Sequence, residues 1–392
     1  MLRRFFSRFG EAFRKGDLFL LLLCVVTSAF GCLIVASATN ASNTGPMRYV
    51  LVQIGASVAG VVLYVLISMF NMEYLAERRR ILTLITLFLI FLLVPFGKTV
   101  NGNRSWLDFS FLPFDIQPAE ICKIFFIVIL ASVMASHQSR ISSPRSVFHM
   151  AAHLVLVFGL NYVISGDMGV SLIFAFIFFG MAWSGGVGMV WFGIVVGAAI
   201  LLLPTAWNML PDDNYMKTRI AVLFDPSLDP NGTGARYQTV RALRSLTGGG
   251  LTGQGLFQGN RTQTNGALFA QHTDFIYCVI GEELGFVGCA VVLTMLCVII
   301  GRCIWVGLKS PEIMRRLTCF GVASAMIFQV VVNVGMCIGV MPVIGLTLPF
   351  ISYGGSSVIA VYMMLGLVSG VYAHPTPTSQ ERYIHAPIQS IQ

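Results

Sequence analysis

Long apolar segments recur along the whole chain and are separated by short polar connections. About 20 apolar residues are needed for a helix to cross the hydrocarbon core of a bilayer, and ten segments of that kind can be marked. The separators at 166–167 and 184–187 are thin, so nine or eleven spans remain alternatives. The expected spans are 17–39, 49–70, 81–96, 118–135, 147–165, 168–183, 188–207, 275–305, 317–340 and 358–372.

The composition agrees with a chain whose solvent is mostly lipid. Of the 392 residues, 56% are hydrophobic and only 11% are charged, whereas soluble domains carry about 25% charged residues. We therefore expect an all-α polytopic membrane protein with one transmembrane domain over residues 17–373. A cytoplasmic interfacial segment is expected over residues 1–16, and a cytoplasmic tail over 374–392.

The positions of lysine and arginine predict the orientation, because short cytoplasmic loops collect positive charge. With the N-terminus inside, the short outer loops hold only Arg48, Lys98 and Arg104. Both termini are then cytoplasmic, and the net charge of +8 reports topology and not nucleic-acid binding. The inner segments hold Arg3, Arg4, Arg8, Arg14, Lys15, Arg78, Arg79, Arg80, Arg140, Arg145, Arg302, Lys309, Arg315, Arg316 and Arg382.

One connection, about 208–274, is far longer than the others and is expected on the outer side. Loops beyond about 15 residues are usually functional or disordered. This loop is Gly-rich and basic, with Arg219, Arg241 and Arg244 among its charges. Long loops cross the membrane whatever their charge, so these arginines indicate an anionic partner at the outer surface.

Ionisable residues inside predicted spans are costly and usually functional. Glu120 and Lys123 are three residues apart and share a helix face, which allows either an internal ion pair or contact with substrate. The adjacent Glu282 and Glu283 cannot both face lipid, and Lys123 or Arg104 are candidate partners. Nine cysteines without a C-x-x-C pair predict small packing residues and no disulfide framework or metal site.

Asp274 stands where the long outer loop re-enters the membrane. Aspartate is a good N-cap residue for the following span. A partly desolvated carboxylate also has a raised pKa and can serve as a general base. The residues alone favour neither interpretation. By contrast, a turn or cap role is expected for Asp167, and His149 and His153 are not expected to bind metal.

The segment 341–357 is apolar but is broken by proline and glycine. Such backbone at membrane depth must be buried by protein or line a cavity. Gly354, Gly355 and Ser356 then open the last span, and helix N-termini bind anions through free N–H groups. Anion binding and simple helix capping are both open for these three residues.

Taken together, these segments resemble the SEDS family (shape, elongation, division and sporulation; the RodA/FtsW/SpoVE type). The likeness covers nearly the whole chain in order. The segment before His272 departs from the family pattern, and Arg104 stands one place earlier than the usual arginine. The matching motifs lie at 101–107 with 117–123, 166–169, 237–238, 248–251 with 253–255, 272–276 with 282–285, 333–335, 341–343 and 348–357.

The resemblance implies a peptidoglycan glycosyltransferase that polymerises lipid II into β-1,4 glycan at the outer face of the membrane. The reaction inverts the donor configuration and releases undecaprenyl diphosphate. Asp274 is the expected base, while Arg104 and Lys123, with Arg244, are expected to bind the diphosphate. Glu120 is expected to hold Lys123 charged and aimed.

The resemblance also implies a class B penicillin-binding protein as transpeptidase partner, and a divalent cation is an optional cofactor whose ligands the sequence does not show. Gln271 and the residues 259–263 are closer to the elongation type, with division and sporulation roles as alternatives. A flippase for lipid-linked oligosaccharides is the alternative function, because broken helices and buried charges also suit transport. The polar residues gather at the outer face, which favours surface chemistry. A scaffold for a partner synthase is a third possibility.

Overall fold

The computed structural model describes residues 10, 13–41, 46–70, 72–100, 102–109, 114–209, 211 and 215–374. Most of the expected interfacial segment 1–16 lies outside these residues, as does the tail beyond His374, so neither expectation is tested. Ten helices of the described chain are long and apolar enough to cross a membrane. The prediction of an all-α polytopic fold with about ten spans is confirmed.

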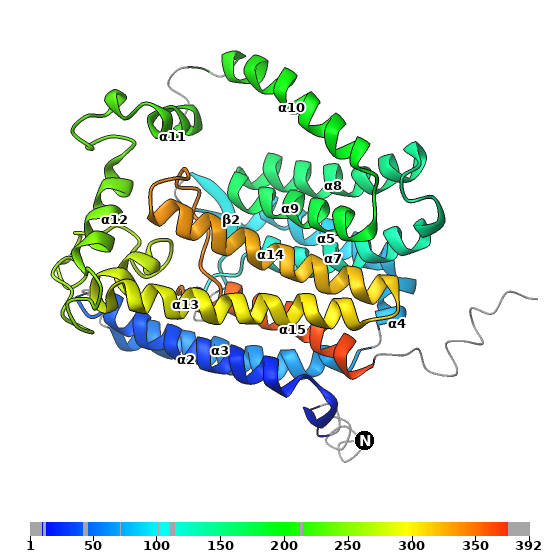
Figure 1. The fold of residues 1–392 in the computed structure, drawn as a ribbon, viewed down its shortest axis with the longest axis horizontal. Coiled ribbons are helices and arrows are strands. Elements are labelled where there is room, and N and C mark those ends of the chain that lie inside the picture. Colours follow the sequence, from blue (N-terminus) through cyan, green and yellow to red (C-terminus); the bar gives the residue numbers. More distant parts are fainter. Residues whose placement is uncertain are drawn as a thin grey trace, which may run out of the picture.

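The helices form one bundle in which most run side by side (Figure 1). The spans are α2 (Leu18–Ala38), α3 (Pro46–Ser68), α5 with α6 (Arg79–Phe91 and Leu93–Phe96), α7 (Pro118–Ser136), α8 (Pro144–Ser165), α9 (Met168–Gly185), α10 (Met189–Met209), α13 (Ile276–Lys309), α14 (Ile313–Cys337) and α15 (Gly355–Ala373). The shorter elements are α4 (Met72–Glu77), β1 (Gly97–Val100), β2 (Asn103–Leu107), η1 (Gln138–Arg140), α11 (Tyr215–Phe224), η2 (Pro226–Leu228) and α12 (Tyr237–Gly248).

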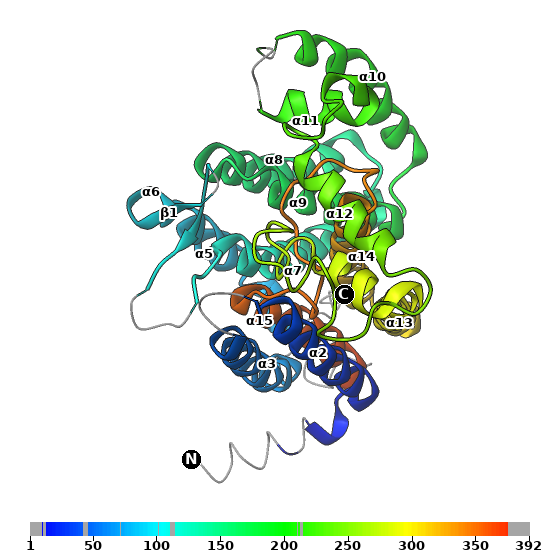
Figure 2. The same ribbon diagram turned by 90° about the vertical axis from the view of Figure 1, so that its left-hand side faces the viewer.

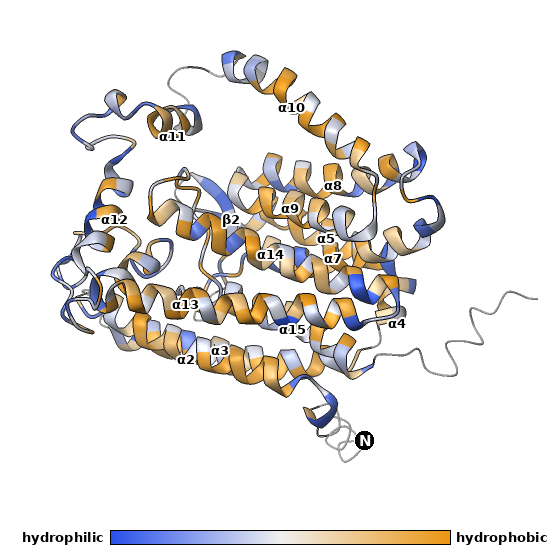
Figure 3. Ribbon diagram, viewed as in Figure 1, coloured by the Kyte–Doolittle hydropathy of each residue, from blue (hydrophilic) through white to orange (hydrophobic). Residues whose placement is uncertain are grey.

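Burial divides the spans into an inner and an outer set. Helices α7, α14 and α15 are mostly buried by protein, whereas α5 and α8 are mostly exposed. Helix α10 is not buried at all and stands away from the bundle (Figure 2). In the view of Figure 3 the helices of the bundle are mostly apolar along their length, as expected for helices whose surroundings are lipid or other apolar helices.

Helix α13 was expected as one span, but the chain reverses within it at Gly285. This glycine has φ 67° and ψ −163°, which interrupts the helix. In a continuous helix Tyr277 and Cys289 would be about 18 Å apart, yet the Cys289 thiol lies 4.0 Å from the Tyr277 carbonyl oxygen. A short helix, 276–284, therefore runs outward, and the longer part, 286–309, runs back through the bundle.

The two adjacent glutamates before this reversal bind the outer loop and not the basic residues suggested above. Glu282 accepts hydrogen bonds from the backbone N–H groups of Arg261 (2.7 Å) and Thr262 (3.1 Å). Glu283 accepts one from the backbone N–H of Phe257 at 3.1 Å. The suggested pairing with Lys123 or Arg104 was wrong, because the partners come from the loop before α13 and, for Glu283, also from Ser37 of α2.

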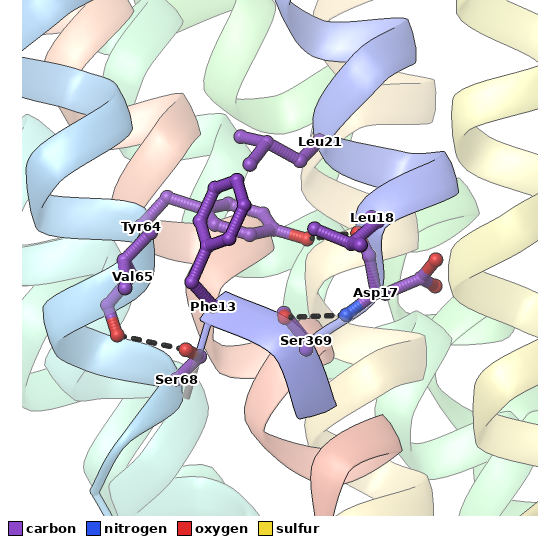
Figure 4. A pocket seen from close by; sticks show the side chains of 9 residues that line it. Phe13, Asp17, Leu18, Leu21, Tyr64, Val65, Ser68 and Ser369 are labelled. Carbon is purple, nitrogen blue, oxygen red and sulfur yellow. Dashed lines mark hydrogen bonds between the residues drawn. The ribbon is translucent and has the colours of Figure 1, made fainter. Parts of the chain in front are cut away.

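The opposite end of the bundle has its own buried polar contact, beside a small pocket (Figure 4). Asp17 caps α2 by accepting from Leu20 N at 3.1 Å, and its backbone N–H donates to Ser369 Oγ at 3.1 Å. Its carboxylate also pairs with Arg302 at 2.7 Å. This ion pair connects the start of α2 to the end of α13.

All nine cysteines are free.

Candidate active site

The residue pair Thr273–Asp274 lies just before α13 and is held by hydrogen bonds from distant segments. Asn333 of α14 donates its side-chain N–H groups to two carbonyl oxygens, that of Asp274 at 2.8 Å and that of Leu346 at 2.6 Å. One buried amide therefore joins the loop before α13 to the segment after α14. This bridge sets the position of the Asp274 backbone relative to the bundle.

The residues before Asp274 are held by the same segment, which enters the bundle between α14 and α15. Ser352 donates to the Thr273 carbonyl oxygen at 2.7 Å and accepts from the Leu348 backbone N–H at 2.8 Å. The Tyr353 backbone N–H donates to the His272 carbonyl oxygen at 2.8 Å. Successive carbonyls from His272 to Asp274 are thus satisfied, and the broken apolar segment is buried as its pattern required.

The Asp274 carboxylate has a pKa raised from the ordinary 3.8 to about 6. Burial is the largest cause, because it disfavours the charged form. The negative charge of Asp167 raises the pKa further, while a hydrogen bond from Thr273 and the positive charge of Arg219 lower it. At neutral pH the group is therefore ionised but basic enough to accept a proton.

Asp167 has the expected cap role, and its carboxylate accepts further hydrogen bonds. It caps α9 by accepting from Val170 N at 3.1 Å. Its other oxygen accepts from Ser105 Oγ and from the Gln117 side-chain amide, both at 3.3 Å. Burial raises the pKa of Asp167, and the charge of Glu120 adds to that shift. A small polar pocket lined by these groups lies beside the start of α9.

A tight turn at residues 344–345 lies between the two aspartates. A Cβ added to Gly169 would stand 2.6 Å from the Ile344 carbonyl oxygen, so α9 begins in contact with this turn. On its other side, a Cβ on Gly345 would stand 3.7 Å from the Asp274 carboxylate. Both glycines leave room for the backbone, which brings the carboxylates of two distant chain segments into one site.

The expected ion pair between Glu120 and Lys123 is present at 2.9 Å, and both side chains are buried. The pair lies inside the bundle, which supports its internal structural role. Contact of either residue with substrate stays a prediction.

The two arginines expected to bind the diphosphate, Arg104 and Arg244, are both exposed. Arg104 is exposed, and its Nε donates to the Gly97 carbonyl oxygen at 3.1 Å. It neighbours Ser105 in β2, and successive strand residues point to opposite faces. Because Ser105 points toward Asp167, Arg104 points away from it. Arg244 is exposed on α12.

The start of α15 is packed by protein at the residues expected to bind an anion. Gly354 N donates to the Gln53 side-chain oxygen at 3.3 Å. A Cβ on Gly355 would meet the Phe114 ring at 2.5 Å. Ser356 Oγ accepts from Gln117 N at 3.4 Å. These contacts support the capping and packing interpretation, and anion binding there stays untested.

Two residues of the site received no role from the sequence. Asn333 belongs to one of the matching motifs, and a buried amide in a span is the signal that could have singled it out. Arg219 is one of many basic residues in the outer loop, and nothing local distinguishes it. In the fold its guanidinium binds the Val343 carbonyl and the Gln238 side chain, close enough to act on Asp274.

Across the described residues, no three His, Cys, Asp or Glu side chains gather as metal ligands. The candidate donors, Asp167 and Asp274, come from two sides of a backbone turn and do not form such a set. The site residues therefore do not fit a metal centre built from protein ligands alone.

Fold and site together define a polytopic membrane protein with a desolvated aspartate at one end of its helix bundle. The family model FtsW/RodA/SpoVE, described as cell cycle protein, matches residues 17–376. The chain belongs to this family and is a multi-pass protein of the bacterial inner membrane.

Relatives of three kinds are similar to the chain. The peptidoglycan glycosyltransferase MrdB of Escherichia coli K12 is 29% identical, with 91% of this chain and 93% of that protein covered. Stage V sporulation protein E of Bacillus subtilis is 30% identical, with 91% and 96% covered. A probable peptidoglycan glycosyltransferase FtsW of Tolumonas auensis is 34% identical, with 71% of each covered.

Solved structures agree with the fold. A chain of a peptidoglycan synthase complex, described for its coordination of polymerization and crosslinking, matches with TM-score 0.76 and 30% identity, covering 92% of this chain and 98% of that one. The rod shape determining protein RodA of Thermus thermophilus matches with TM-score 0.68 and 27% identity, covering 92% and 98%. Relatives named FtsW, MrdB, RodA and stage V sporulation protein E are all similar to the chain, so the closer likeness to the elongation type stays a prediction.

Proposed function

We propose that this protein is a peptidoglycan glycosyltransferase that polymerises lipid II at the outer face of the inner membrane. The observation that carries the proposal is Asp274, a carboxylate with a pKa of about 6 held on a fixed backbone. Relatives across most of the chain are named peptidoglycan glycosyltransferases. The lysine and arginine distribution supports an orientation with both termini inside and Asp274 at the outer face.

Asp274 acts as the general base in this reaction. Its carboxylate takes the proton of the acceptor 4-hydroxyl as the hydroxyl oxygen bonds to C1 of the donor sugar. The bond from C1 to the diphosphate breaks, and undecaprenyl diphosphate leaves with the electron pair. The proton on Asp274 then returns to water, which restores the base.

Positive charge at the outer end offsets the charge on the departing diphosphate. The guanidinium groups of Arg104 and Arg244 are exposed, and arginine binds phosphate oxygens in pairs. Lys123 can add to this positive charge only if substrate reaches the buried ion pair of Lys123 and Glu120. A divalent cation that uses substrate oxygens as ligands is an addition to this scheme and not a requirement of it.

The partner is a transpeptidase of the class B penicillin-binding type, which crosslinks the new glycan. A similar chain works in a complex that coordinates polymerization and crosslinking. Exposed apolar surface on the spans suits contact with a single-span partner within the membrane.

The proposal is tested with purified protein, its transpeptidase partner and lipid II, with glycan products separated on gels. Native protein, Asp274→Asn and Asp225→Asn are compared. Asparagine keeps the size of aspartate but cannot take a proton. Asp225 is exposed in the outer loop and caps η2 through Ser227 N at 3.0 Å, so its substitution makes the same chemical change away from the site.

Native protein and Asp225→Asn are expected to make polymer, and a folded Asp274→Asn is expected to make none. Equal polymer from Asp274→Asn would assign the base to another residue. If none of the three proteins makes polymer but the same samples move lipid II across the membrane of vesicles, the flippase alternative would replace the proposal.

A further inference from the structure

At the end of the bundle opposite Asp274, three helix ends bring basic side chains together. The His149 ring lies 5.1 Å from the His137 ring and 5.3 Å from the His153 ring, measured between centroids. Arg79 donates to Ser136 Oγ at 3.3 Å, and that hydroxyl is 3.2 Å from His137 Nδ1. These five residues, from α5, α7 and α8, are called the histidine–arginine cluster.

Hydrogen bonds orient the imidazole rings of the cluster. His137 Nδ1 lies 2.8 Å from the Val133 carbonyl oxygen, and His153 Nδ1 lies 3.0 Å from the His149 carbonyl oxygen. A carbonyl only accepts, so each Nδ1 carries the hydrogen and donates it. In the neutral rings of His137 and His153 the Nε2 atoms therefore carry no hydrogen.

The side chains that act electrostatically on His149 are all basic. Those groups are His153, His137 and Arg79. The neighbouring helix α4 ends at the exposed Glu77, and Arg140 and Arg145 add exposed positive charge nearby in the chain. An anion bound among these basic groups would offset the repulsion between their positive charges.

Exposed apolar side chains lie next to the cluster. Helices α5 and α8 are the most exposed spans of the bundle besides α10. Phe148, next to His149, is 68% exposed and lies against Trp191, with ring centroids 6.0 Å apart. Tryptophan is typical of the membrane–water interface. Further along the spans, Phe88 and Val155 are also exposed, so apolar surface for acyl chains continues from the cluster.

We propose that the histidine–arginine cluster binds the phosphodiester headgroup of an anionic phospholipid in the inner leaflet. Basic pockets between transmembrane helices on the cytoplasmic side are suited to such headgroups. Arg79 supplies a permanent charge. A phosphodiester only accepts hydrogen bonds, so an imidazole of the cluster can donate to it from Nε2 only in the protonated form. We therefore expect binding to strengthen as the pH falls. The site lies apart from the glycosyltransferase chemistry and does not rest on it.

The test measures binding of dioleoyl phosphatidylglycerol to the purified full chain in detergent micelles, at pH 6 and pH 8. Thermal stabilisation gives the apparent affinity, and native mass spectrometry counts the retained lipid. Dioleoyl phosphatidylcholine and inorganic phosphate are run in parallel. The variants are Arg79→Gln, the double variant His149→Gln with His153→Gln, and the control Lys309→Gln. Lys309 is exposed at the same end of the bundle, beside Trp305.

Phosphatidylglycerol is expected to bind native protein and Lys309→Gln in preference to phosphatidylcholine, more tightly at pH 6 than at pH 8. Arg79→Gln should lose about fivefold in affinity at both pH values. The double histidine variant should lose affinity at pH 6 and match native protein at pH 8.

Three results would overturn the proposal. One is equal binding of the two phospholipids by native protein. Another is the same loss in Lys309→Gln as in Arg79→Gln, which would indicate diffuse surface charge. The third is full stabilisation by inorganic phosphate alone, which would assign the cluster to a free anion. Unchanged stability of the variants in phosphatidylcholine shows that they fold.

Discussion

The side-chain amide of Asn333 donates to the Asp274 carbonyl oxygen at 2.8 Å and to the Leu346 carbonyl oxygen at 2.6 Å. The two acceptors are far apart in the chain, and each belongs to a segment without regular structure. A single residue of α14 thus connects the proposed base to the turn that separates it from Asp167.

Replacing Asn333 by alanine should lower the rate of polymerisation on the order of tenfold to a hundredfold, because loss of the bridge lets the carboxylate shift from its position. The KM for lipid II should change little, since Asn333 touches no exposed surface. Steady-state polymerisation kinetics check this. Ser324→Ala is the matched control, because Ser324 is on the same helix and donates only to its own helix at Phe320 O. An Asn333→Ala enzyme with native kcat would show that the bridge does not position the base.

The polymerisation rate should fall on the acid side with a midpoint near the Asp274 pKa of about 6, because the base must be ionised. Asp167 raises that pKa by repulsion. Asp167→Asn removes the repulsion, lowers the pKa of Asp274 and moves the acid limb to lower pH. The shift should be partial, since burial is the larger cause.

Rate against pH for native protein and the variants measures this shift. Asp108→Asn removes the same charge from the exposed hairpin, where Asp108 pairs with Lys98, and should leave the limb in place. If the acid limb of the pH profile of Asp167→Asn stays in place or moves to higher pH, Asp167 does not raise the pKa of Asp274.

Gly285→Ala should destabilise the protein by about 2–4 kcal/mol, through backbone strain and steric overlap. The added Cβ would stand 2.4 Å from Gly253 N and 2.5 Å from the Leu251 carbonyl oxygen, and backbone atoms cannot rotate away. Gly186→Ala is the control, because Gly186 also has positive φ but its Cβ would meet nothing within 4 Å. Thermal unfolding in detergent should show a much larger loss for Gly285→Ala. Equal losses would mean that the reversal in α13 tolerates a side chain.

Glu282→Gln should loosen the outer loop, because hydrogen bonds to a charged acceptor are worth about 1.5–3 kcal/mol each. Its carboxylate accepts from two backbone N–H groups and from the Thr262 hydroxyl at 2.8 Å. Limited trypsin digestion should cut faster after Arg261 in this variant. Glu77→Gln, an exposed change at the other end of the bundle, should digest like native protein. An unchanged cleavage rate for Glu282→Gln would show that other contacts hold the loop.

Much of the fold follows from the sequence because hydropathy is a local property. A segment of about 20 apolar residues can satisfy its backbone groups in lipid only as a helix. The expected spans therefore coincide with the observed helices within a few residues, as with 118–135 and α7 (Pro118–Ser136). The ion pair of Glu120 and Lys123 was foreseeable for the same reason, since helical spacing alone brings the two together.

The tertiary structure decided what depends on contacts between distant segments. Glu282 and Glu283 were expected to meet basic side chains, but a carboxylate is satisfied equally by backbone N–H groups, and a loop about 20 residues earlier in the chain supplies them. The reversal at Gly285 was invisible to hydropathy, because both halves of α13 are apolar. The raised pKa of Asp274 likewise depends on burial and on Asp167, which only packing brings near. The sequence by itself determined the spans and the candidate aspartate, while helix packing determined the surroundings that make this aspartate a base, because desolvation and charge coupling exist only once the segments meet.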